Sequence, residues 1–447
     1  MTQGDGIDGP SLSAARAERP PYAGPAVEFA DGREHTPFLD LRGFDLVRAA
    51  LVTSLILLIP INTRFLMFIS QHSPHLAGEI VQYTSVGLTD IVFIALIVSV
   101  LPLVRRPRVL VAPFIVGLSM LVVASAVHVL VSPSDQGIAM TVRLAGAVAV
   151  AIVISTMSWQ TLRVVVVWPI AVMGLVQGGM ALSQTLTGTG RLRLDEIAAA
   201  GASWTAGRGT FGHEYGFAAF LMLSLTIALA YGFARGMRPT LWISVCVASA
   251  AIASTFGRAA ALAVIMVGLV YVVGWWRTKD RMLGASALAT LGALGVGLAI
   301  THSGWLARVS SGSSVRVSLA SRSLDVIAIN PVFGVGPGRY GAALADIGLV
   351  SVDRHIVHNV PLLVTAEFGV ILGLAFAVWL LTVGVISLRS SFVALAVFVG
   401  ILPLMFFDNL HYVIPGGVPM LGLWCGALAA LIGTGWRQSE PAVLAKG

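Results

Sequence analysis

The sequence predicts an all-α membrane protein that crosses the bilayer about twelve times. Hydrophobic residues make up 57% of the 447 residues and charged residues only 11%, and the mean hydropathy is +0.88. These values exclude an ordinary soluble domain. Apolar runs of roughly 18 or more residues recur, each long enough to cross about 30 Å of hydrocarbon. The strand alternation of a membrane barrel is absent, so the spans must be helices that satisfy their own backbone groups.

The chain is predicted to form one transmembrane domain, at residues 44–436, between two cytoplasmic tails. Residues 1–43 are rich in Gly, Pro, Ala and charge, which predicts a disordered tail, and they hold no apolar core of the kind that a cleavable signal needs. Residues 437–447 form the second tail. The predicted spans are 46–69, 84–103, 109–131, 138–156, 162–186, 213–235, 240–256, 258–276, 283–302, 361–388, 392–412 and 416–434.

The distribution of basic residues predicts the orientation. Positive charge in short loops is retained on the cytoplasmic side, and both tails are therefore predicted to be cytoplasmic. Two long connections, 187–212 and 303–360, then lie on the extracytoplasmic side, the second of them between the ninth and tenth spans. The basic positions fall in alternate connections, at 105–108, 163, 235–238, 277–281, 389 and 437.

Ionisable residues gather toward the extracytoplasmic ends of the predicted spans. A charge near hydrocarbon is costly and normally faces a cavity or a partner, so this gathering predicts a shared polar vestibule. Each member alone is also compatible with a structural ion pair or an interfacial anchor. The residues are Asp90, His128, Arg143, Glu214, Arg258, Glu367, Asp408 and His411.

The stretch from Trp305 to Gly373 is the richest in groups that can do chemistry. Arginines and a glycine-rich phrase at 330–340 lead to His358 and Asn359, directly before an apolar run. A lone histidine is more often structural. Here, however, His358 can accept a proton from an attacking hydroxyl, with Asn359 or Glu367 arranging its tautomer. The basic residues of the stretch are Arg308, Arg316, Arg322, Arg339, Arg354, His355 and His358.

Two further arginines stand at the starts of predicted spans. Arg208 and His213 lie in a glycine-punctuated approach to the sixth span, where close backbone approach and a helix start favour an anion; a turn with a helix cap is the alternative. Arg258 lies in a very short link between two apolar runs. Its guanidinium either snorkels to the interface or meets an anion in the vestibule, and we favour the anion.

The long loop is predicted to contain one helix and one tight turn. Residues 315–329 have polar and apolar faces typical of a surface helix or lid, which should end at Asn330-Pro331. Arg322 is on the polar face. The phrase at 334–338 lacks the lysine and preceding strand of a phosphate-binding loop, so we interpret it as a turn that presents Arg339, without nucleotide.

No metal or cofactor site is predicted. Cys246 and Cys425 lie in apolar runs without CxxC spacing, which favours packing roles. No HExxH or carboxylate cluster is present that would hold a metal ion. Nothing in the pattern indicates nucleic acid as a partner.

The order of the motifs resembles the O-antigen ligase and polymerase superfamily over about residues 203–385. The resemblance rests on Arg-Gly-Thr-Phe-Gly-His at 208–213, Ser-Thr-Phe-Gly-Arg at 254–258, Arg322 followed by Asn-Pro-Val-Phe-Gly-Val-Gly-Pro-Gly within 322–338, His-Asn at 358–359 and Ala-Glu-Phe-Gly-Val-Ile-Leu-Gly at 366–373. The Ser-Arg pair that is more usual in the family is Gly257-Arg258 here, so any role of that serine is lost.

The resemblance implies an enzyme of cell-surface polysaccharide assembly at the outer face of the bacterial cytoplasmic membrane. Such an enzyme takes a glycan from an undecaprenyl-pyrophosphate carrier and hands it to lipid A core, as a ligase, or to a second lipid-linked repeat unit, as a polymerase; both remain open. Other assembly proteins are possible partners. Arg208 and Arg258 would hold the pyrophosphate, joined by Arg322 and Arg339, and His358 would be the base. Supporting positions are Asn359, Glu367, His213 and Arg143.

The main requirement of the implied reaction is a set of positioned cations at the pyrophosphate leaving group. Charge grows on the pyrophosphate as the sugar–oxygen bond breaks, and guanidinium groups in a poorly hydrated site stabilise it. The main alternative is a secondary transporter or lipid flippase, which predicts two related halves and polar breaks near mid-membrane. A structural partner of an assembly complex is a third possibility.

Overall fold

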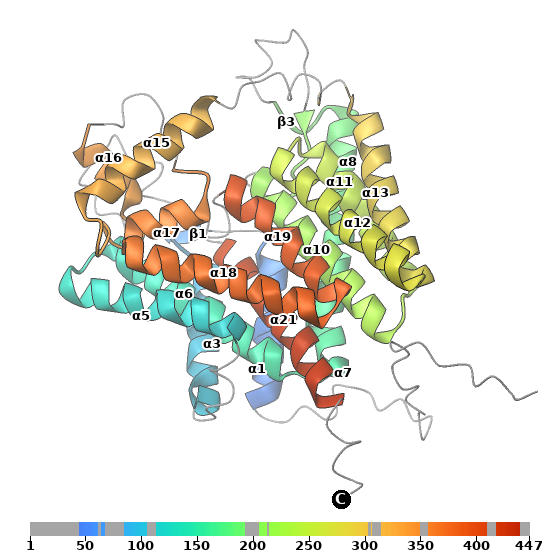
Figure 1. Cartoon of the computed structure of the whole chain (residues 1–447), viewed down its shortest axis with the longest axis horizontal. Helices are drawn as coiled ribbons and strands as arrows, with labels where there is room; N and C mark the ends of the chain where they lie inside the picture. The colour runs from blue at the N-terminus through green and yellow to red at the C-terminus, as the bar shows by residue number, and fades with distance from the viewer. Residues whose placement is uncertain are drawn as a thin grey trace, which may run out of the picture.

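The computed structural model describes residues 44–60, 64–67, 85–104, 113–192, 205–211, 214–302, 305, 314–348, 356–408 and 417–438. Within these residues the chain is a helical bundle with two short antiparallel strand pairs (Figure 1). Seven described helices are long and apolar enough to cross a membrane, and four shorter apolar helices accompany them. The all-α, multi-spanning class is confirmed. The count of twelve spans and the domain limits stay predictions, and both predicted tails lie almost wholly outside the described residues.

The helices before residue 190 form the first part of the bundle. They are α1 (Phe44–Leu58), α3 (Leu88–Val104), α5 (Pro113–Val131), α6 (Asp135–Thr156) and α7 (Trp159–Leu162), which continues through the π-helical turn η2 (Arg163–Val167) into α8 (Trp168–Thr187). Strand β1 (Arg64–Met67) pairs with β2 (Ser85–Gly87), and β3 (Arg191–Leu192) pairs with β4 (Thr205–Ala206).

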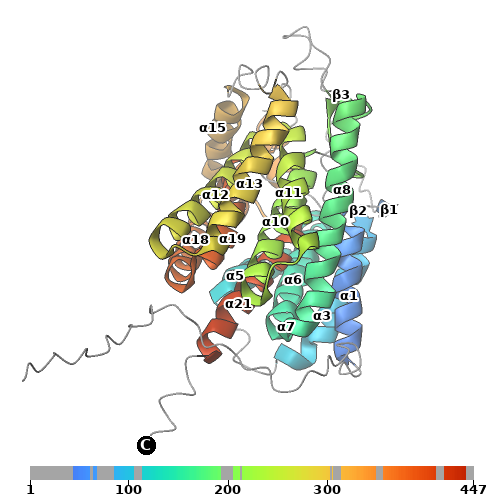
Figure 2. The same cartoon turned by 90° about the vertical axis from the view of Figure 1, so that its right-hand side faces the viewer.

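The later helices form two further groups. The first group is α10 (Glu214–Arg235), α11 (Pro239–Ser254), α12 (Arg258–Thr278) and α13 (Arg281–Ile300), of which α11, α12 and α13 lie side by side with α8 beyond them (Figures 1 and 2). The second is α15 (Ser314–Ile329), α16 (Tyr340–Asp346), α17 (Val360–Phe368), α18 (Val370–Ser390), α19 (Phe392–Phe407) and α21 (Gly417–Gln438).

The predicted spans at 46–69 and 361–388 each contain two separate elements. The run at 46–69 holds α1, which ends at Leu58, and then strand β1. Pro60 explains the early end, because its ring and missing N–H are incompatible with a continuing helix. The run at 361–388 is broken at Gly369, whose φ is +87°. Hydropathy alone does not separate these elements.

Small residues let the helices approach one another closely. Helix α21 packs on α6, and a Cβ added at Gly422 would lie 2.6 Å from the carbonyl oxygen of Ala147. One turn later, a Cβ at Gly426 would lie 3.1 Å from the Cα of Ala151. Two glycines four residues apart are typical of membrane helices that pack by direct van der Waals contact.

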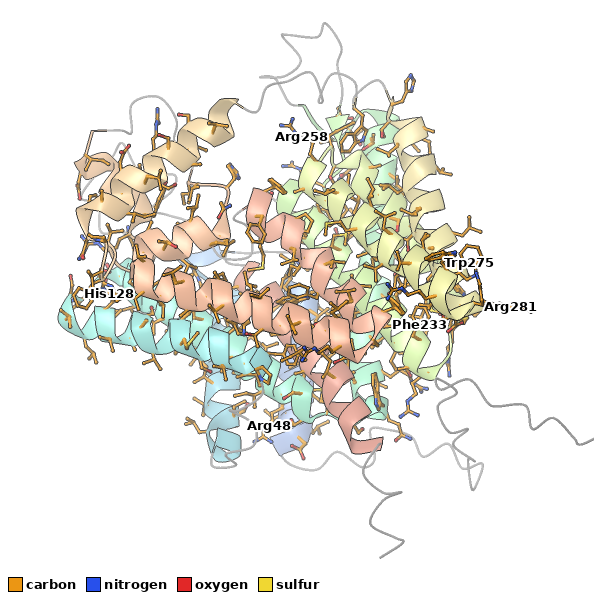
Figure 3. The ribbon with its side chains drawn as sticks, viewed as in Figure 1. Arg48, His128, Phe233, Arg258, Trp275 and Arg281 are labelled. Carbon is orange, nitrogen blue, oxygen red and sulfur yellow. The ribbon has the colours of Figure 1, made fainter. Side chains whose placement is uncertain are left out.

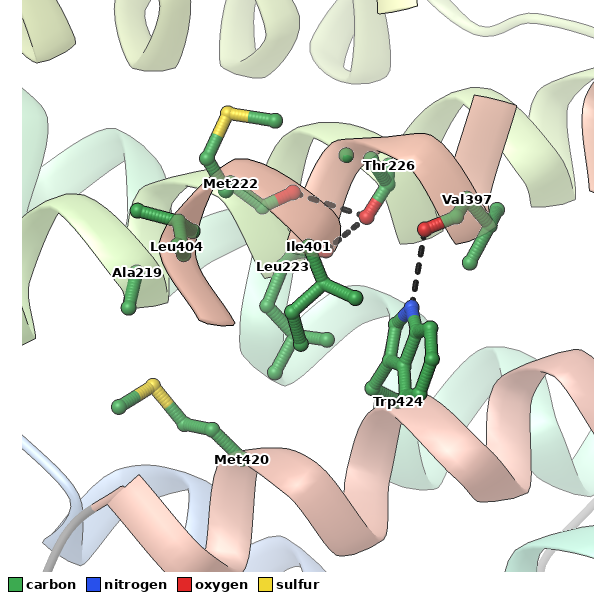
Figure 4. Close-up of a pocket in the computed structure, with 10 residues that line it drawn as sticks. Ala219, Met222, Leu223, Thr226, Val397, Ile401, Leu404, Met420 and Trp424 are labelled. Atoms are coloured by element: carbon green, nitrogen blue, oxygen red, sulfur yellow. Dashed lines mark hydrogen bonds between the residues drawn. The ribbon is translucent and has the colours of Figure 1, made fainter. Parts of the chain in front are cut away.

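The junction of α10, α19 and α21 joins the helix groups. Trp424 is fully enclosed there, and its Nε1 donates a 2.9 Å hydrogen bond to the carbonyl oxygen of Val397 (Figure 4). Thr226 donates to the carbonyl of Met222 at 2.8 Å. The cavity at this junction measures about 10 Å³, which is close to the space of one water, so it is a packing gap and has no room for a substrate.

Candidate functional site

Arg208 lies in a loop that α8 holds by side-chain amides. The Gln184 Oε1 accepts hydrogen bonds from the backbone N–H groups of Arg208 and Gly209, both at 3.0 Å. The Gln177 Oε1 accepts from the backbone N–H of Thr210 at 2.8 Å. These hydrogen bonds give side-chain acceptors to backbone N–H groups in a loop that is neither helix nor strand. The loop is thereby fixed at the C-terminal end of α8, with the Arg208 side chain half-buried.

Arg258 begins α12, directly after a strained turn from α11. Phe256 adopts a φ of +52°, which is uncommon for a residue other than glycine. Trp305 covers this turn, because its Nε1 donates to the carbonyl of Ala253 at 2.9 Å and its ring lies 6.1 Å from that of Phe256. The half-buried Arg258 therefore follows a turn that the Trp305 side chain holds in place, at the upper end of the bundle (Figure 3).

One backbone bond brings the two arginine segments together. The N–H of Gly207 donates to the carbonyl of Ser254 at 3.0 Å. Arg208 follows the first of these residues, and Arg258 comes four positions after the second. The segments that carry Arg208 and Arg258, the first two predicted pyrophosphate-binding residues, are therefore adjacent in the structure.

His358 contacts a carboxylate that lies fifty positions later in the chain. Its Nδ1 lies 3.4 Å from Oδ1 of Asp408, and the His358 side chain is 23% exposed while that of Asp408 is 2% exposed. If Nδ1–H donates to the carboxylate, Nε2 is left as the acceptor. The contact forms where the start of α17 approaches the upper end of α19 (Figure 1).

Asn359 holds His358 at this junction. The Asn359 Oδ1 accepts from the N–H of Leu362 at 2.9 Å and caps α17, while its Nδ2 donates to the carbonyl of Phe406 at 3.0 Å. A cap of this kind contributes about 1 kcal/mol to helix stability. One side chain therefore ties the helix that follows His358 to the helix that precedes Asp408.

Glu367 lies at the other end of α17. It is fully buried, and eight residues of helix separate it from Asn359 by roughly 12 Å along the axis. The carboxylate that contacts the imidazole is therefore Asp408. Sequence reasoning placed Asp408 in the polar vestibule but did not pair it with His358, because nothing in local spacing joins two residues from different helices.

The glycine-rich phrase at residues 330–338 packs directly on the break between α17 and α18. The N–H groups of Val335 and Gly336 donate to the carbonyls of Ala366 and Glu367, at 3.0 and 2.9 Å. These carbonyls end α17 and have no partner within the helix. The N–H of Val370, which begins α18, donates to the carbonyl of Pro331 at 2.8 Å.

Glycine is required at both sides of this contact. A Cβ at Gly334 would lie 2.3 Å from the carbonyl carbon of Glu367, and one at Gly369 would lie 1.9 Å from the carbonyl oxygen of Val332. Both residues also have positive φ. The phrase therefore has a packing role, beyond forming the turn before Arg339.

Arg143 forms a buried ion pair with Asp90. The Nε–Oδ1 distance is 2.9 Å and the Nη2–Oδ2 distance is 3.2 Å, and both side chains are almost fully enclosed. The pair joins α6 to α3. Since a bidentate pair of this kind fixes two helices relative to each other, the geometry favours the structural interpretation of Arg143.

Arg322 lies half-buried on α15, the helix predicted at 315–329 and observed at Ser314–Ile329. Leu319, Ser323 and Val326 are buried on one face of this helix. The hydroxyl of Ser323 is hydrogen-bonded to that of Tyr340 at 2.9 Å. Helix α15 packs on α17, so Arg322 is on the helix next to the one that His358 precedes.

Arg339 lies elsewhere, in a cavity of about 620 Å³ beside His128. His128 is at the far end of α5, well away from Arg258 (Figure 3). The structure therefore does not bring Arg339 together with Arg258. His213, Arg354, His355 and His411 lie outside the described residues. Among those that are described, no group of three His, Cys, Asp or Glu residues is arranged to hold a metal ion.

The family comparison supports the resemblance stated from the motifs. Residues 241–377 match the family model described as O-Antigen ligase. The match runs from α11 into α18, and includes Arg258 and His358 but not Arg208. No curated protein matches the chain. Residues 241–377 of this multi-spanning membrane protein are therefore similar to the O-antigen ligase family.

Proposed function

We propose that the protein transfers a glycan from an undecaprenyl-pyrophosphate carrier to an acceptor hydroxyl, at the extracytoplasmic face of the bacterial cytoplasmic membrane, in cell-surface polysaccharide assembly. The observation that carries the proposal is the contact between His358 and Asp408, because it gives the imidazole the carboxylate partner that a general base needs. The family match over residues 241–377 supports the same reaction class.

His358 acts as the base. Its Nε2 accepts the proton of the acceptor hydroxyl while the acceptor oxygen forms a bond to the anomeric carbon. The bond from that carbon to the pyrophosphate oxygen breaks, and its electron pair leaves with the pyrophosphate. Asp408 holds the ring and stabilises the imidazolium that forms. Direct displacement of this kind inverts the anomeric carbon.

Arg208 and Arg258 bind the pyrophosphate, with Arg322 as a third ligand. The bond from Gly207 to Ser254 supports a shared position for the first two. Preorganised guanidinium groups stabilise the charge that develops on the leaving group without reorganising during the reaction. Asn359 positions His358, Arg143 braces the helices, and Glu367 and His213 are supporting residues.

The proposed topology has about twelve spans and both termini in the cytoplasm. The segment at 303–360, with α15 and α16, is the extracytoplasmic loop that carries the site to the membrane surface. The partners are the bilayer, the lipid-linked donor, a glycan or glycolipid acceptor and other polysaccharide-assembly proteins, without nucleic acid.

The test is a transfer assay with purified protein. A lipid-linked oligosaccharide is offered with lipid A core or with a second lipid-linked unit, and the product is identified by mass, which separates ligase from polymerase. His358→Ala should abolish the product. His302→Ala, which changes an exposed histidine at the end of α13, is the matched control. Lipid transport across vesicles without any transfer product would contradict the proposal.

A further inference from the structure

We propose that the protein has a second ligand site, for the phosphate headgroup of a membrane lipid, in the cavity that contains Arg339 and His128. The cavity measures about 620 Å³, within the range of about 300–1,000 Å³ typical of small-molecule sites. The end of α5 and the following turn form one wall. The phrase at 330–338 and helix α16 form the other.

Arg339 supplies an available positive charge. Its side chain is half-buried, and no residue in the described part of the chain accepts a hydrogen bond from its guanidinium. Asp346 also reaches the cavity, but it lies at the opposite end of α16, roughly 10 Å along the helix axis. The guanidinium is thus free to bind an oxyanion with two parallel hydrogen bonds.

Neighbouring polar groups are oriented by the backbone. The His128 Nε2 lies 2.5 Å from the carbonyl oxygen of Phe333, and since a carbonyl only accepts, Nε2 carries the proton. The Asn330 Oδ1 accepts from the N–H of Phe333 at 3.2 Å, which leaves the amide NH₂ of Asn330 as a donor. The hydroxyl of Ser132 is a further donor on the wall of the cavity.

Exposed apolar side chains surround this polar centre. Val127, Leu130 and Val131 are exposed at the end of α5, and Val332 and Phe333 are exposed on the opposite wall. Helix α5 ends in apolar residues and is followed by a polar Ser-Pro-Ser turn. Such a transition is expected at headgroup level in a spanning helix.

The combination favours a lipid over a soluble anion. A soluble phosphate would use Arg339 but gain nothing from the apolar surface. A phospholipid places its phosphate at the guanidinium and its chains along the exposed apolar side chains. The site lies apart from Arg258 (Figure 3), so the inference does not depend on the proposed transfer reaction.

The experiment measures lipid binding by native mass spectrometry of the full chain in a phosphate-free detergent. Three probes are titrated: phosphatidylglycerol, a diacylglycerol with the same chains, and inorganic phosphate. Phosphatidylglycerol should bind most tightly. Arg339→Gln should weaken it by about fivefold or more, as expected for one cation at a membrane surface, and Arg339→Lys should retain part of the affinity.

Arg281→Gln is the matched control, because Arg281 is an exposed arginine at the start of α13 and should leave binding unchanged. Equal thermal stability of parent and variants excludes misfolding as the cause of a loss. Parental affinity of Arg339→Gln would overturn the proposal, as would equally tight binding of diacylglycerol. Equally tight binding of inorganic phosphate would show a site for a soluble anion and would overturn it too.

Discussion

The N–H of Gly207 donates a 3.0 Å hydrogen bond to the carbonyl oxygen of Ser254, which joins the loop of Arg208 to the turn before Arg258. A Cβ at Gly207 would lie 2.4 Å from the carbonyl oxygen of Ala181. Gly207→Ala should therefore displace this loop, destabilise the protein by about 1–3 kcal/mol and weaken donor binding. Thermal unfolding in detergent and a donor-binding titration measure both effects.

Gly179→Ala is the control for that change. Gly179 is on the same helix as Ala181, and a Cβ there meets nothing within 4 Å. Replacing a helical glycine by alanine stabilises a helix by roughly 0.5–1 kcal/mol. If the two variants behaved alike, the contact between the two loops would have no role in donor binding.

Asp408→Asn should lower the transfer rate while donor binding stays unchanged. The amide keeps the shape of the carboxylate but cannot stabilise an imidazolium, and general-base catalysis contributes about a hundredfold or more to a rate. Single-turnover transfer measures the loss. A rate close to that of the parent protein would remove Asp408 from the mechanism, whereas loss of donor binding would indicate a structural role.

Arg143→Met should destabilise the protein strongly. It leaves the carboxylate of Asp90 buried between α3 and α6 without its bidentate partner, and such changes cost about 3–5 kcal/mol. The double variant Asp90→Leu with Arg143→Met should recover most of the loss, because neither charge of this pair remains buried. Denaturant unfolding of the parent protein and the two variants tests this, and a double variant as unstable as Arg143→Met would contradict it.

Gly334→Ala should prevent the phrase at 330–338 from packing on α17. Its Cβ would lie 2.3 Å from the backbone of Glu367, at a φ of +72°. We expect poor recovery of folded protein, measured by size-exclusion chromatography in detergent. The control is Gly295→Ala on α13, where an added Cβ meets nothing within 4 Å. Equal recovery of the two variants would show that the contact is dispensable.

The local sequence pattern predicted those features of the fold that nearby residues determine, such as helix ends before a proline. Helix α15 ends at Ile329 as expected, because Pro331 restricts the residue before it. The early end of α1 follows from Pro60, although hydropathy carried the predicted span to residue 69. The break at Gly369 was missed because apolar residues flank it on both sides.

The candidate site was predictable only in its parts. Arg258 and His358 could be chosen because a charge is costly beside apolar sequence. The pairing of His358 with Asp408 and the separation of Arg339 from Arg258 depend on how distant helices pack, which one sequence does not specify. The packing role of the 330–338 phrase could likewise not be predicted, since the residues it contacts lie about thirty positions later in the chain.

The bonds between this phrase and residues 366–370 have a mechanical consequence. The phrase holds the end of α17 through Ala366 and Glu367, and the start of α18 through Val370, so the break at Gly369 is fixed from both sides. Arg339 is attached to one end of that clamped unit and His358 to the other. Under the two proposals, a lipid bound at Arg339 would therefore stiffen the body that carries the imidazole, so that the composition of the surrounding bilayer would affect the mobility of the proposed base.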